Sequence, residues 1–233
     1  MNVSGVEIEV VKKDIKNMHL NVMPPSGKVR ISAPYGTSDE VINLFAVKKI
    51  SWIKKQVEKF RSQERQTERE YITGESHYLW GRRYRLEVKY SNKSNNVELK
   101  GNKMILTVRE KSTKKQRENY INEWYRSELK AKLPSIVDEW ESAIGVKANE
   151  VTIKNMRTRW GTCNAEAKRV WINLQLAKKP VKCLEYIVIH ELVHLREKNH
   201  TKAFIEQMDT YMPDWRVVKD ELNSFILDRY MEE

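Results

Sequence analysis

The sequence has 233 residues with an apolar content of 40%, enough for one larger domain with a sizeable core and a smaller accessory domain. It carries 43 Lys and Arg against 32 Asp and Glu, so its formal net charge of +11 would attract polyanions. Two cysteines exclude a disulfide-stapled scaffold, no apolar stretch approaches the roughly 20 residues of a membrane span, and no secretory leader opens the sequence, so we expect a soluble cytoplasmic protein.

The first 62 residues predict short strands followed by a helix. Alternating or extended apolar residues predict three strands, at residues 6–11, 19–22 and 29–32. Residues 38–62 then predict a single helix, because Ser38 can cap it and apolar side chains recur at helical spacing. These side chains are Val41, Leu44, Ile50, Ile53 and Val57.

Strand signals return after a polar connector at residues 61–70. The predicted strands are residues 84–88, 97–99 and 104–108, joined by turns. Residues 1–110 are therefore predicted to form a β-rich accessory domain with one helix. No internal repeat stands out in the sequence.

The charged tract at residues 109–119 marks the predicted boundary, so residues 111–233 form the second domain. A long helix is expected over residues 115–142, with a kink at Pro134 and an end at Gly145. Two strands flanking a loop and then two helices follow: strands 151–153 and 170–174, loop 157–164, and helices after Pro180 and Pro213. This order is typical of a compact α+β domain.

Three of the five histidines lie in residues 190–200, with the spacing of a metal site. On a helix, His190 and His194 project from one face and can bind one ion together, while Glu191 reaches the space beside it. A catalytic zinc takes three protein ligands and leaves the fourth position to water, whose pKa falls to about 7. Glu191 would accept the proton of this metal-bound water as it attacks a carbonyl. The motif therefore predicts a Zn²⁺-dependent hydrolase.

The third zinc ligand is predicted to be His200. A helix stop ends residues 195–199 and Thr201 can cap a following helix, so the chain can turn and bring His200 back to the ion. Acidic residues farther along the chain are the alternative third ligands: Glu206, Asp209 and Asp214. A chance HExxH on an amphipathic helix is a further alternative, although the apolar run at residues 183–189 indicates a buried helix unsuited to unligated histidines.

Several segments together resemble the YgjP-like predicted zinc metallopeptidases, which are related to the SprT-like and WLM peptidases. The matching segments are residues 156–164 (MRTRWGTCN), 170–174 (VWINL), Pro180, 190–195 (HELVHL) and 199–201 (NHT), and the specific motifs among them are RWGTCN and HELVHL with the following NH. Weaker matches lie at residues 52–53, 74–75 and 79–84, so the resemblance covers nearly the whole chain. Thr162 and Thr201 stand where the family often has Ser, and both keep the hydroxyl.

The resemblance implies a zincin-like, minimal gluzincin-type metallopeptidase domain at residues 111–233, with His190, His194 and His200 as ligands and Glu191 as base. It also keeps an alternative open, because some members of the family have been linked to nucleotide hydrolysis. A nucleoside triphosphate pyrophosphohydrolase could use the same metal site, although the sequence has no Walker-type glycine loop. A nucleic-acid-binding module with structural zinc is the third hypothesis, and Glu191 argues against it because a structural ion needs no base.

Cys163 is a candidate fourth ligand, which would close the zinc shell and make the ion structural. Nothing near it supplies a CxxC partner, and the pattern places it in a loop before a strand. We therefore favour a buried thiol that packs beside the site.

Four residues near the motif are candidates for contacts with the substrate or the transition state: Arg157, Arg159, Trp171 and Asn173. The two arginines could stabilise an oxyanion, or they could form structural ion pairs. The strand at residues 170–174 is expected either to bind an extended peptide or protein substrate along its edge or to be a core strand.

The basic charge supports a second class of partner. Denser runs lie at residues 12–13, 48–49, 82–83, 111–117 and 178–179. Such a surface attracts nucleic acid or nucleotides, although scattered lysines usually only face solvent, and no recognition helix, RNP signature or zinc finger is present. The sequence indicates no membrane partner and no particular oligomeric state.

Overall fold

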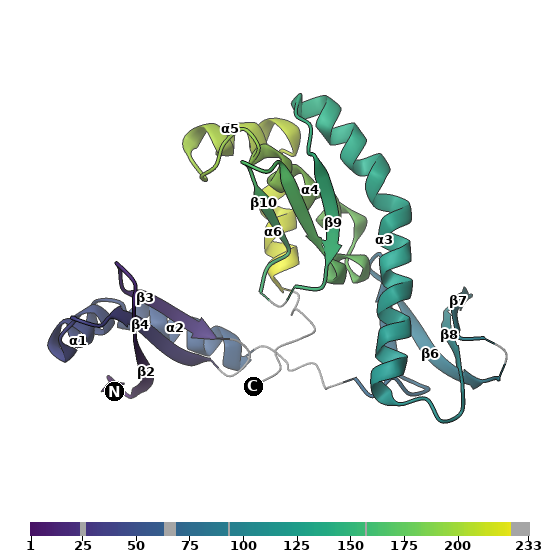
Figure 1. The fold of residues 1–233 in the computed structure, drawn as a ribbon, viewed down its shortest axis with the longest axis horizontal. Coiled ribbons are helices and arrows are strands. Elements are labelled where there is room, and N and C mark those ends of the chain that lie inside the picture. Colours follow the sequence, from purple (N-terminus) through teal and green to yellow (C-terminus); the bar gives the residue numbers. More distant parts are fainter. Residues whose placement is uncertain (24–26, 63–68, 93, 157, 225–233) are drawn as a thin grey trace. The chain divides into compact units, whose positions relative to one another are not determined.

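The computed structural model describes residues 1–23, 27–62, 69–92, 94–156 and 158–224 (Figure 1). These residues form an α+β protein, which confirms the predicted class, and the chain divides into two compact units between Thr67 and Glu68. The predicted boundary at residues 110 and 111 therefore falls inside the second unit. The reason is long-range packing, because Leu106 and Val108 share one hydrophobic core with the elements that carry the histidine motif.

The first unit is a four-stranded sheet with two helices. Its elements are β1 (Asn2–Val3), β2 (Val6–Lys13), β3 (His19–Met23), β4 (Lys28–Pro34), α1 (Asp39–Lys48) and α2 (Ile50–Ser62). The strand order is β1-β2-β4-β3, with β2 and β4 parallel and the other pairs antiparallel. Apolar side chains of both helices, including Ile42 and Ile53, pack with Ile8 and Ile31 of the sheet.

The single helix predicted over residues 38–62 is wrong in one respect, because it is divided at Lys49. The backbone N–H of Lys49 donates to the carbonyl of Ala46 at 3.0 Å. This i to i−3 bond closes a tighter turn than the i to i−4 bond of an α-helix. Neither glycine nor proline marks this break.

The second unit begins with a sheet that repeats the arrangement of the first. It contains β5 (Ser76–Leu79), β6 (Arg82–Tyr90), β7 (Asn96–Lys100) and β8 (Lys103–Val108) in the order β5-β6-β8-β7, with only β6 and β8 parallel. Both sheets open with a hairpin whose two turn residues have positive φ, Ser4–Gly5 in one and Trp80–Gly81 in the other. The structure thus contains a repeated four-stranded unit that the sequence did not indicate.

The long helix α3 (Lys114–Ile144) runs along both sheets of the second unit (Figure 1). A capping box between Thr113 and Gln116 begins it, and Gly145 ends it with φ of 72°. Pro134 lies inside it, as predicted.

The remaining elements surround the histidine motif: β9 (Glu150–Lys154), β10 (Gly161–Asn164), β11 (Arg169–Asn173), the 3₁₀ helix η1 (Leu174–Lys178), α4 (Val181–Val193), α5 (Lys202–Tyr211) and α6 (Trp215–Ser224). The three strands form a sheet in the order β10-β11-β9. β10 lies within the predicted loop at residues 157–164, so that prediction is wrong for its last four residues, which pair antiparallel with β11. No helix among the described residues has the length and apolar character needed to cross a membrane.

Candidate metal centre

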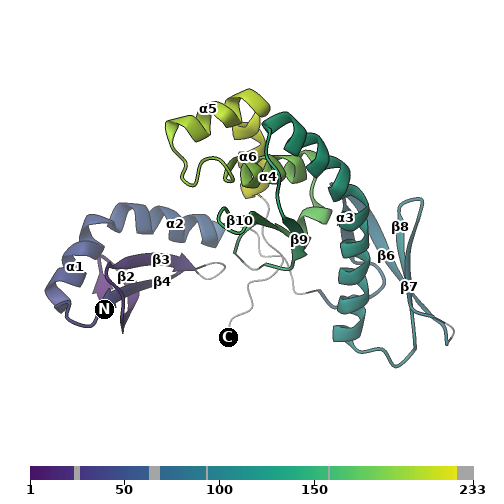
Figure 2. The same cartoon turned by 45° about the horizontal axis from the view of Figure 1, so that its top comes forward.

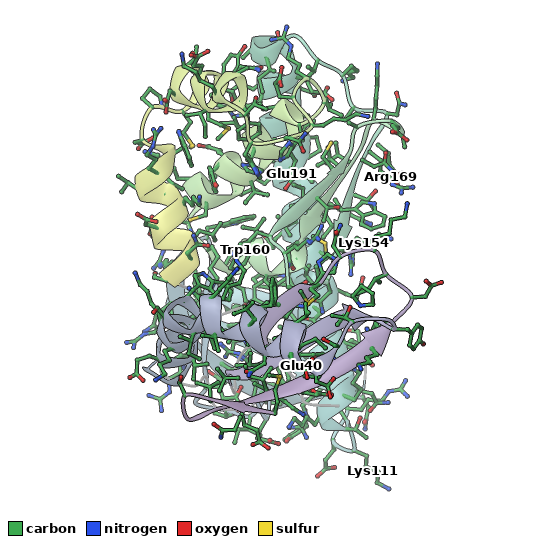
Figure 3. All side chains as sticks on the ribbon, turned by 90° about the vertical axis from the view of Figure 1, so that its left-hand side faces the viewer. Glu40, Lys111, Lys154, Trp160, Arg169 and Glu191 are labelled. Atoms are coloured by element: carbon green, nitrogen blue, oxygen red, sulfur yellow. The ribbon has the colours of Figure 1, made fainter. Side chains whose placement is uncertain are left out.

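α4 carries the histidine motif through the interior of the second unit. It contacts β10 and β11 on one side and α6 on the other (Figure 3), and α5 also packs against it (Figure 2). Most of its side chains are buried, which fits the apolar run before the motif. His190 lies in its last turn and His194 caps its C-terminus.

A short turn after α4 brings His200 back to the other two histidines. The Thr201 hydroxyl caps α5 by accepting a hydrogen bond from the N–H of Phe204, so His200 directly precedes a fixed helix start. The Phe204 ring is 1% exposed and lies 4.7 to 5.0 Å from all three imidazole rings, measured between centroids. Phe204 is therefore a shared apolar contact that packs against all three histidine rings.

The three Nε2 atoms converge on one point. His190 Nε2 lies 3.2 Å from His194 Nε2 and 3.1 Å from His200 Nε2, and the three ligand atoms lie within 4.8 Å of one another. Nitrogen ligands about 2.0–2.1 Å from a tetrahedral zinc ion are separated by about 3.3 Å. The spacing of the three imidazoles therefore fits a tetrahedral ion with one open position.

The charge states of His190 and His194 also suit a bound cation. Nδ1 of His194 lies 2.9 Å from the carbonyl oxygen of Glu197, which fixes the tautomer that leaves Nε2 free as a lone-pair donor. Burial, together with the neighbouring His194 and His200, lowers the pKa of His190 to about 3. Burial also lowers the pKa of His194. Neutral imidazoles are the form that binds metal ions.

The three acidic residues considered as alternative third ligands take part in other interactions. Asp209 pairs with Arg216 and accepts from the Trp215 indole, Asp214 pairs with Lys182, and Glu206 lies near Lys202. Among the described residues, only the three histidines form a group of at least three ligands able to hold an ion.

Cys163 lies outside this group of ligands. It sits in β10 and not in the predicted loop. Its thiol is half-buried, and burial together with the charge of Glu191 raises its pKa to about 11. These properties agree with a protonated thiol beside the site.

Glu191 is buried against β10. It is 5% exposed, and this burial raises the pKa of its carboxyl to about 8, while the charge of Arg159 acts in the opposite direction. A cation held by the histidines would favour the carboxylate further. Gly161 makes room for this side chain, because a Cβ at Gly161 would lie 2.6 Å from Glu191 Oε1 and 2.7 Å from Ile187 Cγ2.

Gly161→Ala is expected to lower the turnover number at least tenfold while the bound metal is retained. The added methyl group would displace the Glu191 carboxylate from its position, because it would clash with both Glu191 and Ile187 on the buried helix α4. Turnover and metal content of the purified variant test this. Gly36→Ala is the matched control, since a Cβ there meets nothing within 4 Å, and equal activity of the two variants would contradict the prediction.

The four predicted contact residues differ in their positions in the structure. Arg157 lies outside the described residues. Arg159 is exposed and acts electrostatically on Glu191. Asn173 is fully buried, and its Nδ2 donates to the carbonyls of Met156 at 2.9 Å and Arg159 at 2.6 Å, so it anchors the preceding loop and is enclosed by protein.

Trp171 lies on the face of the sheet opposite Glu191. Gly161 faces Glu191 and pairs with Ile172, so the next residue, Trp171, points the other way. Lys154 and Arg169 lie over its ring at 5.0 and 4.8 Å, and Figure 3 shows both on the far side of the strands from Glu191. The geometry does not support the predicted contact of Trp171 with a substrate at the histidines.

Of the two expectations for residues 170–174, a binding edge and a core strand, the structure supports the core strand, because β11 is the central strand and pairs on both sides. β10 is the edge strand next to α4. The N–H of Asn173 donates to the carbonyl of Trp160 at 2.9 Å, so bonded pairs alternate from that position. The N–H and C=O groups of Gly161 and Cys163 therefore point toward the open edge.

Two residues of the site were missed by sequence analysis, Gly161 and Phe204. A glycine inside a strand is a signal of close approach by another group, so Gly161 could have been identified once β10 was recognised. Phe204 reads as an ordinary core residue of an amphipathic helix, and nothing in the sequence distinguishes it.

One comparison with known proteins supports a peptidase family. A family model described as YgjP-like, metallopeptidase domain, matches residues 16–225, and no curated protein matches the chain. Two solved metallopeptidase zymogens are similar. Abylysin of Pyrococcus abyssi is 16% identical with a TM-score of 0.36, covering 38% of this chain and 90% of its own. Jannalysin of Methanocaldococcus jannaschii is 20% identical with a TM-score of 0.36, covering 40% and 94%.

Proposed function

Since this chain belongs to the YgjP-like metallopeptidase family, and is thus a metal-dependent hydrolase, we propose that it is a zinc peptidase whose ion is held by His190, His194 and His200. The observation that carries the choice of residues is the convergence of three imidazoles at a spacing suited to zinc. Nitrogen donors with one open position are typical of catalytic zinc.

Glu191 is the proposed base. When bound, zinc supplies a Lewis acid that acidifies water and polarises a carbonyl. Glu191 accepts a proton from the attacking water and later gives it to the departing amine, so the carboxyl returns to its starting state. Its near-complete burial keeps bulk water from competing for that proton, and Gly161 holds it in place from the sheet side.

We propose that the peptide or protein substrate pairs with the open edge of β10. Main-chain bonds to Gly161 and Cys163 would align an extended peptide beside the strand that contacts Glu191. Cys163→Pro removes one outward N–H without breaking the ladder to β11, and one lost hydrogen bond of about 1 kcal/mol should raise KM about fivefold. Cys163→Ala keeps the N–H and serves as control. A KM unchanged in both folded variants would contradict pairing at this edge.

Peptide cleavage that depends on the metal is the direct test of the function. We expect the purified protein to cleave members of a peptide library, to lose this activity after treatment with a zinc chelator, and to regain it when zinc is restored. Mass spectrometry of the fragments identifies the cleaved bond. Release of pyrophosphate from nucleoside triphosphates, with no peptide cleaved, would instead support the alternative hydrolase.

A further inference from the structure

Arg159 is an exposed arginine placed two residues before Gly161, the residue in contact with the buried Glu191. Its guanidinium forms no salt bridge with any residue that the structure describes. An arginine that is solvated, unpaired and close to a buried base has charge available for a ligand.

The backbone at Arg159 is fixed, although its side chain reaches solvent. The buried amide of Asn173 donates to the Arg159 carbonyl at 2.6 Å and to the Met156 carbonyl at 2.9 Å, and the Asn173 N–H donates to the Trp160 carbonyl at 2.9 Å. Asn173 is fully buried on the central strand. Asn173 is therefore a positioning residue, because its hydrogen bonds hold the backbone of Arg159 beside β10.

We infer that Arg159 is a catalytic residue that binds the carbonyl oxygen of the scissile peptide bond and stabilises the negative charge that develops there. The inference rests on the proposed peptidase function. A guanidinium suits this role because it stays charged at any working pH and presents several N–H donors in a fixed plane.

The reaction step balances with water as the only co-reactant. The water oxygen forms a bond to the carbonyl carbon while Glu191 takes one water proton, and the carbonyl π pair moves to its oxygen as negative charge. Arg159 donates hydrogen bonds to that oxygen. The pair then returns, the C–N bond breaks, and the amine nitrogen takes the proton from Glu191. Donors aimed at the charge of the transition state act mainly on kcat.

Arg169, on β11, shows what a structural arginine looks like near the same site. Its guanidinium lies 4.8 Å from the Trp171 ring centroid, on the face opposite Glu191. Arg169→Ala is therefore the matched control for Arg159→Ala, because it removes the same type of side chain from β11, beside the loop that carries Arg159, without touching the site.

The test compares kcat, KM, zinc content and thermal stability of wild type, Arg159→Ala, Arg159→Lys and Arg169→Ala, with Glu191→Gln as the inactive reference. We expect Arg159→Ala to lower kcat about 10²–10³-fold with KM, zinc content and stability nearly unchanged. Arg159→Lys should recover part of this loss, and added methylguanidinium should raise the turnover of Arg159→Ala but not that of Glu191→Gln.

Full turnover in Arg159→Ala with none in Glu191→Gln would overturn the role of Arg159 and leave the peptidase proposal intact. A rise in KM alone, without any change in kcat, would also overturn it, because it would show ordinary substrate binding. No metal-dependent peptide cleavage by the wild type would instead overturn the proposed function itself, and the role of Arg159 with it.

Discussion

Glu191→Gln is expected to lower kcat for peptide hydrolysis by about 10²–10⁴-fold and to leave the zinc content unchanged. Glutamine keeps the shape of the side chain but cannot accept a proton from water. Glu191 lies outside the group of three imidazoles, so its replacement should not weaken binding of the ion. Steady-state turnover and elemental analysis of the same preparation measure both effects.

Glu185→Gln is the matched control for this variant. Glu185 lies on the same helix, α4, and its carboxyl is also partly buried, which raises its pKa. It is not part of the metal group, so its replacement should leave turnover within about twofold of wild type. Turnover retained in Glu191→Gln would assign the base to another residue, and loss of zinc in that variant would make Glu191 part of the ligand set.

Local patterns predicted most of the elements. The C-terminal end of α3 was predictable because Gly145 is a strong stop signal, and the start of α4 follows directly from Pro180. The division between the units was not, because it depends on which distant residues share a core. Leu106 on β8 and Ile121 on α3 belong to the same core as α4, and no local signal reports such packing.

The site was predictable where its geometry follows from one helix. His190, Glu191 and His194 are brought together by helical spacing alone, and the cap at Thr201 accounts for the return of His200. The sheet was harder, because β10 has only four residues without a clear apolar alternation. Once β10 is missed, the open edge is assigned to the wrong strand.

The same error explains the misplaced contact residue. Trp171 has the character of a ligand-binding residue, but the face on which a strand residue lies depends on its pairing partner. Pairing of Ile172 with Gly161 turns Trp171 away from Glu191. The residue type of Trp171 suggested a contact with the substrate, but the pairing register of β10 and β11 determines which face of the sheet it lies on.

His200→Ala is expected to remove the ion and with it all peptidase activity. His200 is the exposed member of the triad, and its Nε2 lies 3.1 Å from that of His190, so its loss leaves two ligands. Changes in residues that only orient ligands reduce metal affinity 10–100-fold, so loss of a ligand should exceed about 100-fold. Elemental analysis should find one zinc per chain in wild type and almost none in His200→Ala.

Stability supplies a second measure that needs no substrate. Zinc at 100 times its dissociation constant should stabilise wild type by about 2.7 kcal/mol, and this gain should vanish in His200→Ala at the same concentration. Glu206→Ala is the control, because Glu206 was an alternative third ligand and lies near Lys202 on the surface. If Glu206→Ala loses the zinc-dependent stabilisation and His200→Ala keeps it, the third ligand is the glutamate, and the turn after α4 must rearrange when the ion binds.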